Sequence, residues 1–358
     1  MSNAMYSVDD LLQLATLCFR AVGVPDEDAK WTAHVLVRAD LQGTATHGLS
    51  RLLAYVAGIC KGKIKAHPNL QVTKTGPATT VVDGDQGLGP VVAKVAVETA
   101  IHQAKQAGVG VVAVRNGNHA GAMSTYTELA AAEGLIGLAL TNAQPAIPPW
   151  GGRQAYFGTN PIALAAPKCQ GDPISIDLAT SVTARGNIII AAKKNELIPE
   201  GWALDETGLP TTDAVTALKG SVLPMAGPKG YSLALLVEIL SGLLSGGNFG
   251  HTVGSIYDEG SEPPGTGMFM MVLNPDFFIG VESFTTRVAQ LAAEVTSVPL
   301  AAGYERIRLP GERRQELEQE RRMRGVPLTL QTESELRKVA SDYGIIMPKP
   351  ITSTASTG

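Results

Sequence analysis

Between residues 79 and 141, short runs of β-branched and apolar residues alternate with helical segments. The runs Thr79–Asp83, Val109–Val114 and Leu135–Thr141 have strand character, and helices are predicted between them over Val91–Gly108 and Ala120–Glu133. Strands that alternate with helices form a layered structure, because each helix returns the chain to the sheet. This alternation restricts the fold class to α/β, with a sheet at the centre of the chain.

Later segments are predicted to extend this sheet and to cover it. Ile162–Ala165 and Ile174–Ile176 are short strands, and Met268–Leu273 is apolar at nearly every position, as in a central strand. Tyr231–Ser245 is apolar almost all round, which predicts a buried helix. Gly246–Gly267 is polar and rich in glycine, and we expect a long loop there, either a lid or an interface arm.

Both ends of the chain are predicted to be helical, and we expect them to pack together. Residues 5–75 and 305–348 would then form one helical domain, and residues 76–304 a central α/β domain with a mixed sheet. Residues 1–4 resemble the remnant of an expression tag, and residues 349–358 are expected to form a flexible tail.

Charge and cysteine usage exclude several classes of function. The net charge is −4 and Lys and Arg form no block, which argues against nucleic acid and anionic membranes as partners. The three cysteines, Cys18, Cys60 and Cys169, have no short spacing, which argues against a disulfide framework and a zinc site. No apolar run approaches the length of about 20 residues that spans a bilayer. We therefore expect a cytoplasmic protein without a bound metal.

The pentad from His47 to Arg51 is the first candidate site. It places an imidazole four residues before a guanidinium, so that both can point into one cleft on a helical turn. Histidine exchanges protons near neutral pH, and arginine can hold a carboxylate with two parallel N–H bonds. The pair fits redox chemistry on a 2-oxo or 2-hydroxy acid, but a pair of this kind taken alone more often caps a helix end and holds a loop.

A glycine pattern that matches a dinucleotide fingerprint begins at Gly108. A Rossmann fingerprint lies after a strand and before a helix, whereas here a predicted helix ends at Gly108 and a strand follows. We therefore interpret Gly108 as the C-cap of a helix, and expect any dinucleotide to bind by a route other than the Rossmann one.

His119 lies in a predicted loop between a strand and a helix, followed by Gly121. Such loops hold ligands in α/β sheets, and a glycine lets a ligand approach the backbone. His119 is either an acid/base or a residue that holds the turn.

Asp177, at the end of a strand, is either an acceptor for ribose hydroxyls or a helix cap. Lys229 is predicted at a helix start, where a cation is unfavourable, which suggests an anionic partner such as a phosphate.

Taken together, several motifs resemble the malate/L-lactate dehydrogenase family, over nearly the whole chain. This is a family of non-Rossmann NAD(P)-dependent oxidoreductases that includes ureidoglycolate and sulfolactate dehydrogenases, diketogulonate reductase and piperideine/pyrroline-2-carboxylate reductases. The matching stretches are Thr46-His47-Gly48 with Arg51, Gln86-Gly87-Leu88-Gly89, Asn118-His119 with Gly121, Gly158-Thr159-Asn160-Pro161, Asp177-Leu178-Ala179-Thr180-Ser181, Pro199-Glu200-Gly201-Trp202-Ala203 and Lys229-Gly230.

The resemblance implies a central domain that binds NAD or NADP and a helical domain that serves the substrate and dimerisation. Arg51 would bind the substrate carboxylate, His119 and His47 would take part in proton transfer, and Thr46 would lie beside His47. The positions implied for cofactor contact are Gly121, Asn142, Asp177, Leu178, Ala179, Lys229, Gly311 and Glu312. The resemblance also implies a homodimer.

The expected reaction is hydride transfer between a nicotinamide and the 2-carbon of a small carboxylate. The substrate is either a 2-oxo/2-hydroxy acid or a cyclic imine carboxylate, since the Arg51 clamp serves both. A homologue that binds a dinucleotide without turnover is the alternative from another class. Which histidine carries the proton, and whether NAD or NADP is preferred, stay open at this point.

Overall fold

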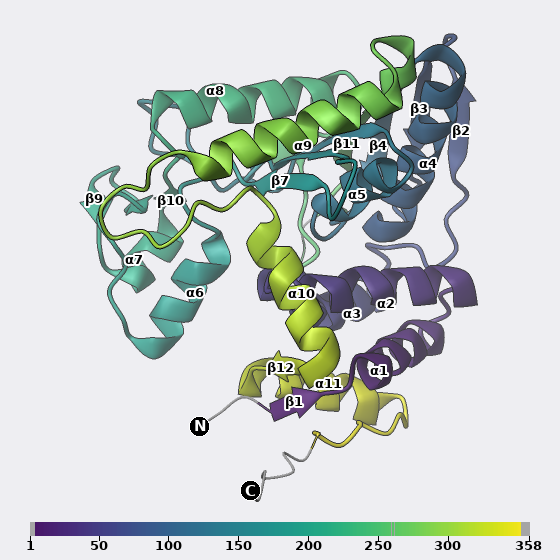
Figure 1. Ribbon diagram of the computed structural model, residues 1–358. Coiled ribbons are helices and arrows are strands. Elements are labelled where there is room, and N and C mark those ends of the chain that lie inside the picture. The colour runs from purple at the N-terminus through teal and green to yellow at the C-terminus, as the bar shows by residue number, and fades with distance from the viewer. Residues whose placement is uncertain (1–3, 259, 261, 352–358) are drawn as a thin grey trace, which may run out of the picture.

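A mixed seven-stranded sheet lies at the centre of the computed structural model, which describes residues 4–258, 260 and 262–351 (Figure 1). The strand order is β2-β3-β4-β11-β5-β6-β7; β3 and β4 run parallel, and the other neighbours are antiparallel. The strands are β2 (Gln71–Lys74), β3 (Thr79–Asp83), β4 (Val109–Gly117), β5 (Ile136–Thr141), β6 (Ile162–Ala166), β7 (Ile174–Leu178) and β11 (Thr266–Leu273). The predicted α/β class and mixed sheet are confirmed.

The central strand β11 is apolar along its length because both faces of the sheet are covered. Met268, Met270 and Val272 belong to the core under α4 (Gly89–Ala107) and α5 (Ser124–Ala132). The intervening Phe269 and Met271 pack on the opposite face with α8 (Pro228–Val237) and the following π-helix η3 (Glu238–Leu243). Side chains alternate between the two faces of a strand, so a strand buried on both faces needs apolar residues at every position.

Gly108 ends α4 as the sequence predicts. Its φ is 81°, in the left-handed region, and its N–H donates to the Ala104 carbonyl at 2.9 Å. β4 begins at the next residue. The interpretation of Gly108 as a helix cap, and not as part of a dinucleotide fingerprint, is confirmed.

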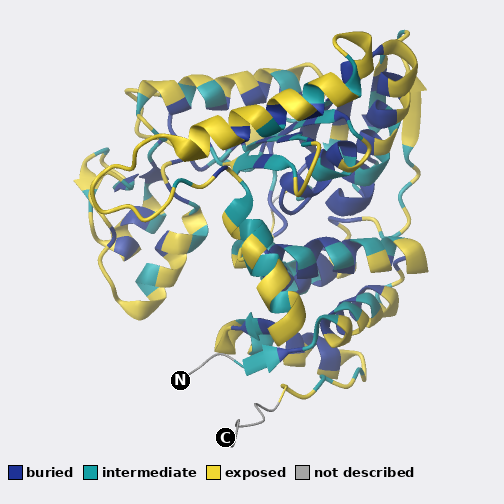
Figure 2. Cartoon of the chain, in the orientation of Figure 1, coloured by how far each residue is buried: buried dark blue, intermediate teal, exposed yellow. Residues whose placement is uncertain are grey.

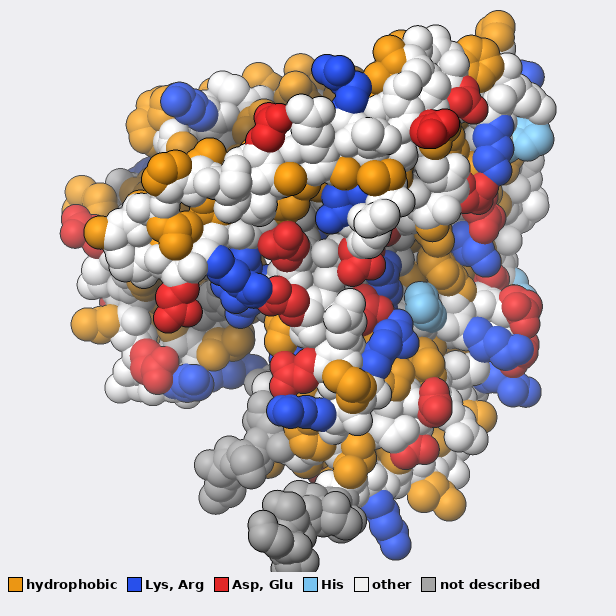
Figure 3. Space-filling view, in the orientation of Figure 1, with side chains coloured by type: hydrophobic (Ala, Val, Ile, Leu, Met, Phe, Trp, Pro, Cys, Tyr) orange, Lys and Arg blue, Asp and Glu red, His pale blue; other side chains and the backbone are white. Residues whose placement is uncertain are grey.

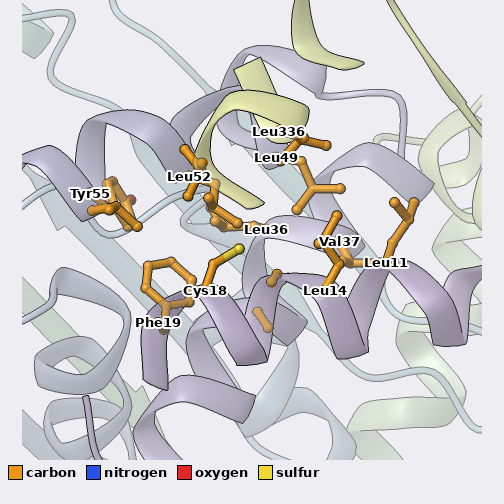
Figure 4. Close-up of a cluster of buried hydrophobic side chains, with 14 of the residues drawn as sticks. Leu11, Leu14, Cys18, Phe19, Leu36, Val37, Leu49, Leu52, Tyr55 and Leu336 are labelled. Carbon is orange, nitrogen blue, oxygen red and sulfur yellow. The ribbon is translucent and has the colours of Figure 1, made fainter. Parts of the chain in front are cut away.

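Helices from both ends of the chain share one hydrophobic core. Leu14, Leu36 and Leu52 from the N-terminal helices meet Leu336 from the C-terminal segment, as Figure 4 shows. The elements are β1 (Ala4–Tyr6), α1 (Val8–Ala21), α2 (Asp26–Leu41), η1 (Ala45–His47), η2 (Leu49–Arg51), α3 (Leu52–Cys60), α10 (Glu312–Arg324), β12 (Val326–Leu328) and α11 (Leu330–Asp342). Pairing of β1 with β12 joins the two ends.

A partly buried ionic network connects these helices with the sheet. Glu128 on α5 accepts from Arg38 on α2 and from the Ser175 hydroxyl on β7, and Arg314 on α10 donates to the same serine at 2.8 Å. Elsewhere on the face shown in Figure 3, acidic and basic side chains are interspersed.

The segment after β7 folds into a small lobe that the sequence did not predict. It contains α6 (Arg185–Lys194), α7 (Ala214–Lys219) and a sheet of three two-residue strands, β8 (Ala203–Leu204), β9 (Pro210–Thr211) and β10 (Ser221–Val222). Its apolar core is small, formed by residues such as Ile188, Ile198 and Val222. Strands of two residues are too short to show any periodicity, which explains why the sequence pattern missed them.

The helix predicted over Tyr231–Ser245 is not buried all round. Ala234, Val237 and Ser241 are buried against the sheet, but the opposite face of α8 and η3 is exposed (Figure 2). The exposed apolar residues there are Leu235, Leu236, Ile239, Leu243 and Leu244. The apolar pattern predicted burial correctly on one face only, because no element of the described chain covers the other.

Three further differences concern boundaries. Helix α5 begins at Ser124 and not at Ala120, since Gly121 has a φ of 78° that ends regular geometry. Ala4, assigned to a tag remnant, pairs with Leu328 in β1–β12. Ile351 lies in the expected flexible tail, but its N–H donates to the Met5 carbonyl at 2.7 Å; the rest of that tail, residues 352–358, lies outside the described residues.

Three remaining elements complete the described chain: η4 (Gly250–Thr252), η5 (Pro275–Phe277) and α9 (Val281–Ser297). The predicted long loop contains η4 and ends where β11 begins. Among the described residues, none of the helices has the length and apolar character needed to cross a bilayer.

Candidate active site

Two histidines that lie far apart in the sequence stack against each other. His47 is the last residue of η1, and His119 lies between β4 and α5. Their ring centroids are 5.3 Å apart and their planes differ by 22°. Both side chains are only half-buried, so a ligand can reach them. The fold thus brings together the two histidines that the sequence proposed for proton transfer.

Tyr55 fixes the orientation of His119. Its hydroxyl lies 2.6 Å from Nδ1 of His119 and 2.8 Å from the backbone oxygen of the same residue. The carbonyl can only accept, so the hydroxyl donates its single proton there and accepts from Nδ1–H. This assignment leaves the lone pair of neutral His119 on Nε2. Tyr55 is buried on α3 (Figure 4), four residues after Arg51, a helical spacing that would have flagged it in the sequence.

The side chain of Arg51 is held in place from two sides. Its Nε donates to the backbone oxygen of Thr46, and its Nη1 donates to the Tyr257 hydroxyl at 3.1 Å. The guanidinium carbon lies 5.3 Å from the centroid of the Tyr257 ring. These bonds use two of the five N–H groups of a guanidinium, which leaves donors for a carboxylate. Thr46 also contacts His47, with 3.1 Å between its Oγ1 and Nδ1.

The site favours neutral histidines. Burial and the nearby Arg51 lower the pKa of His47 to about 4. Burial, His47 and Arg51 together hold the pKa of His119 well below its usual range. A neutral imidazole with a free lone pair accepts protons, which suits removal of the hydroxyl proton from a 2-hydroxy acid. A substrate carboxylate bound to Arg51 would offset the positive charge that disfavours the protonated form.

A cavity of about 770 Å³ lies next to this site, a volume within the usual range for small-molecule pockets. Gln86 and Asn116 line it from the strand ends that precede His119, and Asp258 lines it from the loop that carries Tyr257. Arg185 lines it from the start of α6, where the next residue, Gly186, lies against Thr46.

Most of the residues implied for cofactor contact gather around the segment from Asp177 to Thr180. An Asp177 carboxylate oxygen accepts from the backbone N–H of Ser124, the first residue of α5, at 2.9 Å. Gly311, just before α10, lies against Ser175 of the same strand. Gly230, in the first turn of α8, lies against the backbone oxygen of Thr180. The N-termini of α5, α8 and α10 therefore lie along the stretch of chain from Ser175 to Thr180.

The other residues of this group lie at the end of β7 and at the starts of α8 and α10. Leu178 and Lys229 are exposed, and Lys229 makes no ion pair with any residue that the structure describes. Glu312 accepts from the Leu309 N–H at 3.0 Å, and Ala179 is half-buried after β7. The Asp177 carboxylate accepts from the N-terminus of α5, a helix from another part of the chain, and is not the N-cap of the next helix, α6, which begins at Arg185; burial raises the pKa of this carboxyl, against the effect of the Ser124 bond.

The side chain of Asn142 makes three hydrogen bonds in the interior. Its Oδ1 accepts from the Gly267 N–H at 2.8 Å, and its Nδ2 donates to Glu238 at 3.1 Å and to the Asn248 carbonyl at 2.8 Å. Glu238 also accepts from Asn160 at 2.7 Å. These bonds hold η3 and the following loop to the sheet, and the cofactor contact implied for Asn142 stays a prediction.

A family model described as malate/L-lactate dehydrogenase matches residues 6–337, a span that includes all of these residues. The chain belongs to the malate/L-lactate dehydrogenase family. The resemblance found in the sequence is thereby confirmed. With it, the chain is an oxidoreductase of the 2-hydroxy acid dehydrogenase type that depends on a nicotinamide cofactor.

Several members of the malate/L-lactate dehydrogenase family are similar over most of this chain. L-sulfolactate dehydrogenase of Methanocaldococcus jannaschii is 43% identical over 90% of this chain and 92% of its own. (2R)-3-sulfolactate dehydrogenase (NADP(+)) of Chromohalobacter salexigens is 40% identical over 89% and 93%. Ureidoglycolate dehydrogenase (NAD(+)) of Escherichia coli K12 is 39% identical over 81% and 82%. Relatives of similar identity are thus named for different cofactors and different substrates.

Solved structures of the family have the same fold. Malate dehydrogenase from Pyrococcus horikoshii superposes with a TM-score of 0.89 at 36% identity, covering 96% of this chain and 97% of its own. Δ1-piperideine-2-carboxylate reductase from Pseudomonas syringae superposes with a TM-score of 0.84 at 32% identity, covering 94% and 99%.

Proposed function

We propose that this enzyme transfers a hydride between NAD(P)H and the 2-carbon of a small 2-oxo or 2-hydroxy acid. The observation that carries the proposal is the stacked pair of His47 and His119 with the Arg51 guanidinium beside it. The pair offers a proton acceptor, and the guanidinium offers a clamp for the carboxylate next to the reacting carbon.

In the proposed reaction, each side chain acts on a stated part of the substrate. Arg51 binds the carboxylate and thereby fixes the position of the 2-carbon. His119 takes the proton of the 2-hydroxyl at its Nε2 in oxidation and returns a proton to that oxygen in reduction. Tyr55 holds the ring through Nδ1. His47 lies against His119 and is the second candidate for proton transfer, and Thr46 supports both His47 and Arg51.

The residues around Asp177 fit a dinucleotide. The N-termini of α5, α8 and α10 lie along the stretch from Ser175 to Thr180, and the backbone N–H groups and positive dipole ends of helix starts suit a pyrophosphate. Lys229, at the start of α8, has no ion-pair partner among the described residues, and Gly121 and Gly311 have the positive φ values that the turns before α5 and α10 require. We propose that Gly121, Asp177, Leu178, Ala179, Lys229, Gly311 and Glu312 hold NAD or NADP, which supplies or accepts the hydride when bound.

A substrate assay tests the proposed reaction. The oxidation of NADH and of NADPH is followed by absorbance with pyruvate, oxaloacetate, 2-oxoglutarate, 3-sulfopyruvate and piperideine-2-carboxylate in turn. We expect turnover with at least one 2-oxo acid, and the cofactor with the higher kcat/KM identifies the preference. Turnover with the imine alone would identify a cyclic imine reductase. Binding of the dinucleotide without turnover on any substrate would contradict the proposal and favour a non-catalytic homologue.

The contact of Tyr55 with His119 predicts a moderate loss of kcat when the hydroxyl is removed. Tyr55→Phe leaves Nδ1–H and the carbonyl of His119 without a partner, and we expect kcat to fall about tenfold, or about 1.4 kcal/mol. Cofactor KM should stay unchanged. Tyr343→Phe is the control, since Tyr343 lies at the end of α11 against Cys60. An unchanged kcat in the Tyr55 variant would show that His119 does not depend on this hydroxyl.

We further propose that the enzyme is a homodimer that covers the exposed apolar face of α8 and η3. Leu236, Ile239, Leu243 and Leu244 are between 43% and 58% exposed and follow one another at helical spacing. A contiguous exposed apolar helix face is typical of a protein interface. A second copy of this chain would bury the face and explain why the helix is apolar almost all round.

Sedimentation equilibrium tests the dimer. We expect the mass of two chains for the wild type and of one chain for the double variant Leu236→Asp, Leu243→Asp, because two buried charges without partners are costly at an interface. Met323→Asp, at an 81% exposed position on α10, is the matched control and should stay dimeric. A monomeric wild type, or a double variant that stays dimeric, would overturn this assignment.

A further inference from the structure

The corner that carries His47 and Arg51 rests on a buried carboxylate. Asp40, in the last turn of α2, accepts from the backbone N–H of Leu49 at 2.7 Å. Leu49 is the first residue of η2, and the first N–H groups of a helix have no partner within it. Asp40 therefore caps the short helix that ends in Arg51, although it comes from a different helix.

Gly48 brings the same corner directly onto this carboxylate. A Cβ at residue 48 would lie 2.3 Å from Cγ and Oδ1 of Asp40 and 2.4 Å from Oδ2. Gly48 lies between η1, which ends in His47, and η2, which ends in Arg51. The close approach requires glycine, and it holds the junction of the two turns against α2.

Asp40 occupies an unfavourable position for a carboxylate that has only a structural task. It is 4% exposed, and burial raises its pKa to about 7, although the Leu49 bond and the charge of Arg321 lower it. Arg321 on α10 donates to the backbone oxygen of Asp40. Among the described residues, none forms a salt bridge with the Asp40 carboxylate. Burying an unpaired carboxylate costs free energy, so an apolar residue would stabilise α2 better unless the corner needs this acceptor.

We propose that Asp40 is a positioning residue for the reaction: it fixes the two turns that hold His47 and Arg51 at the substrate. Few contacts separate Asp40 from the site. Its carboxylate accepts a hydrogen bond from the N–H of Leu49 at the start of η2, and the Arg51 side chain donates to the backbone oxygen of Thr46 in η1. Its own helix is anchored in the core through Leu36, Val37 and Leu41. This role rests on the proposed function of His47, His119 and Arg51.

The test compares Asp40→Ala with Asp40→Asn in an enzyme whose wild-type turnover has been established. Alanine removes the acceptor, whereas asparagine keeps an acceptor oxygen of similar shape for the Leu49 N–H. We expect kcat/KM for the carboxylate substrate to fall about 10²-fold in the alanine variant, with a lower kcat and a higher KM, since a shift of about 1 Å costs this much. We expect the asparagine variant to recover most of this loss, and the dissociation constant of the reduced cofactor to stay unchanged in both.

A control variant and a second variant distinguish a loss of positioning from general damage to α2. Thr32→Val removes another buried polar group of α2, whose Oγ1 has no partner among the described residues, and its kinetics should match the wild type. If Asp40→Ala does not fold, Gly48→Ala displaces the corner while Asp40 stays, and the same change in kcat and substrate KM is expected. Wild-type kinetics in Asp40→Ala, or equal losses in alanine and asparagine variants, would overturn the role. A wild type without turnover would overturn the proposed function and this role with it.

Discussion

The His119→Ala variant is expected to lose about 10²–10⁴-fold in kcat, the usual contribution of a positioned acid/base. His119 is the histidine whose orientation the fold controls most closely, because the Tyr55 hydroxyl bonds its Nδ1 and leaves Nε2 free. Removing the ring removes the proton acceptor but no group of the proposed cofactor site. Steady-state kinetics in both directions, together with cofactor binding, measures the effect.

The control for this variant is His102→Ala, since His102 is exposed on α4 and bonds only Gln106 among the described residues. Near-normal turnover of His119→Ala would contradict the assignment and move proton transfer to His47. The pH dependence gives an independent readout. Because the pKa of His119 is held well below its usual range, kcat/KM for oxidation should stay constant through neutral pH and fall only in more acidic solution, where the ring gains a proton.

The Arg51→Gln variant is expected to lower kcat/KM for the carboxylate substrate about 10²–10³-fold, or about 3–4 kcal/mol, as for other buried charge pairs that lose one partner. Arg51→Lys should recover only part of this loss, because an ammonium cannot form two parallel bonds to a carboxylate. Cofactor binding should not change.

Arg115→Gln is a suitable control, because Arg115 pairs with Asp83 on the surface, at 2.9 Å. Substrate KM and kcat are measured for all three arginine variants. A substrate KM that does not respond to Arg51→Gln would show that another cation binds the carboxylate, and the proposed orientation of the substrate would be wrong.

The local patterns of the sequence predicted the central sheet well. Thr79–Asp83 forms a strand with the predicted bounds, β11 lies in the middle of the sheet, and Gly108 caps α4. These features depend on nearby residues, since strand alternation and a left-handed glycine need no information from distant parts of the chain. The residues of the candidate site could also be proposed from the sequence, because the motifs around His47 and His119 are local.

Features that depend on contacts between distant parts of the chain could not be predicted from the sequence. The exposure of Leu243 and Leu244 depends on what covers η3, which the periodicity of one segment does not report. The hydrogen bonds of the Asn142 amide to Glu238 and Gly267 join residues far apart in the chain, and no local pattern predicts them. Asp40 carries no sequence signal for its role, because its relation to Leu49 exists only once α2 and η2 have packed.

Isotope transfer tests the central claim most directly. The enzyme is supplied with NADH or NADPH that carries deuterium on C4 of the nicotinamide, together with the 2-oxo acid that the assay identifies, and the product is analysed by mass spectrometry and NMR. We predict a 2-hydroxy acid with one deuterium on its 2-carbon and none elsewhere. Product without deuterium at that carbon, or consumption of the labelled cofactor without formation of a 2-hydroxy acid, would contradict hydride transfer to the carbon beside the carboxylate.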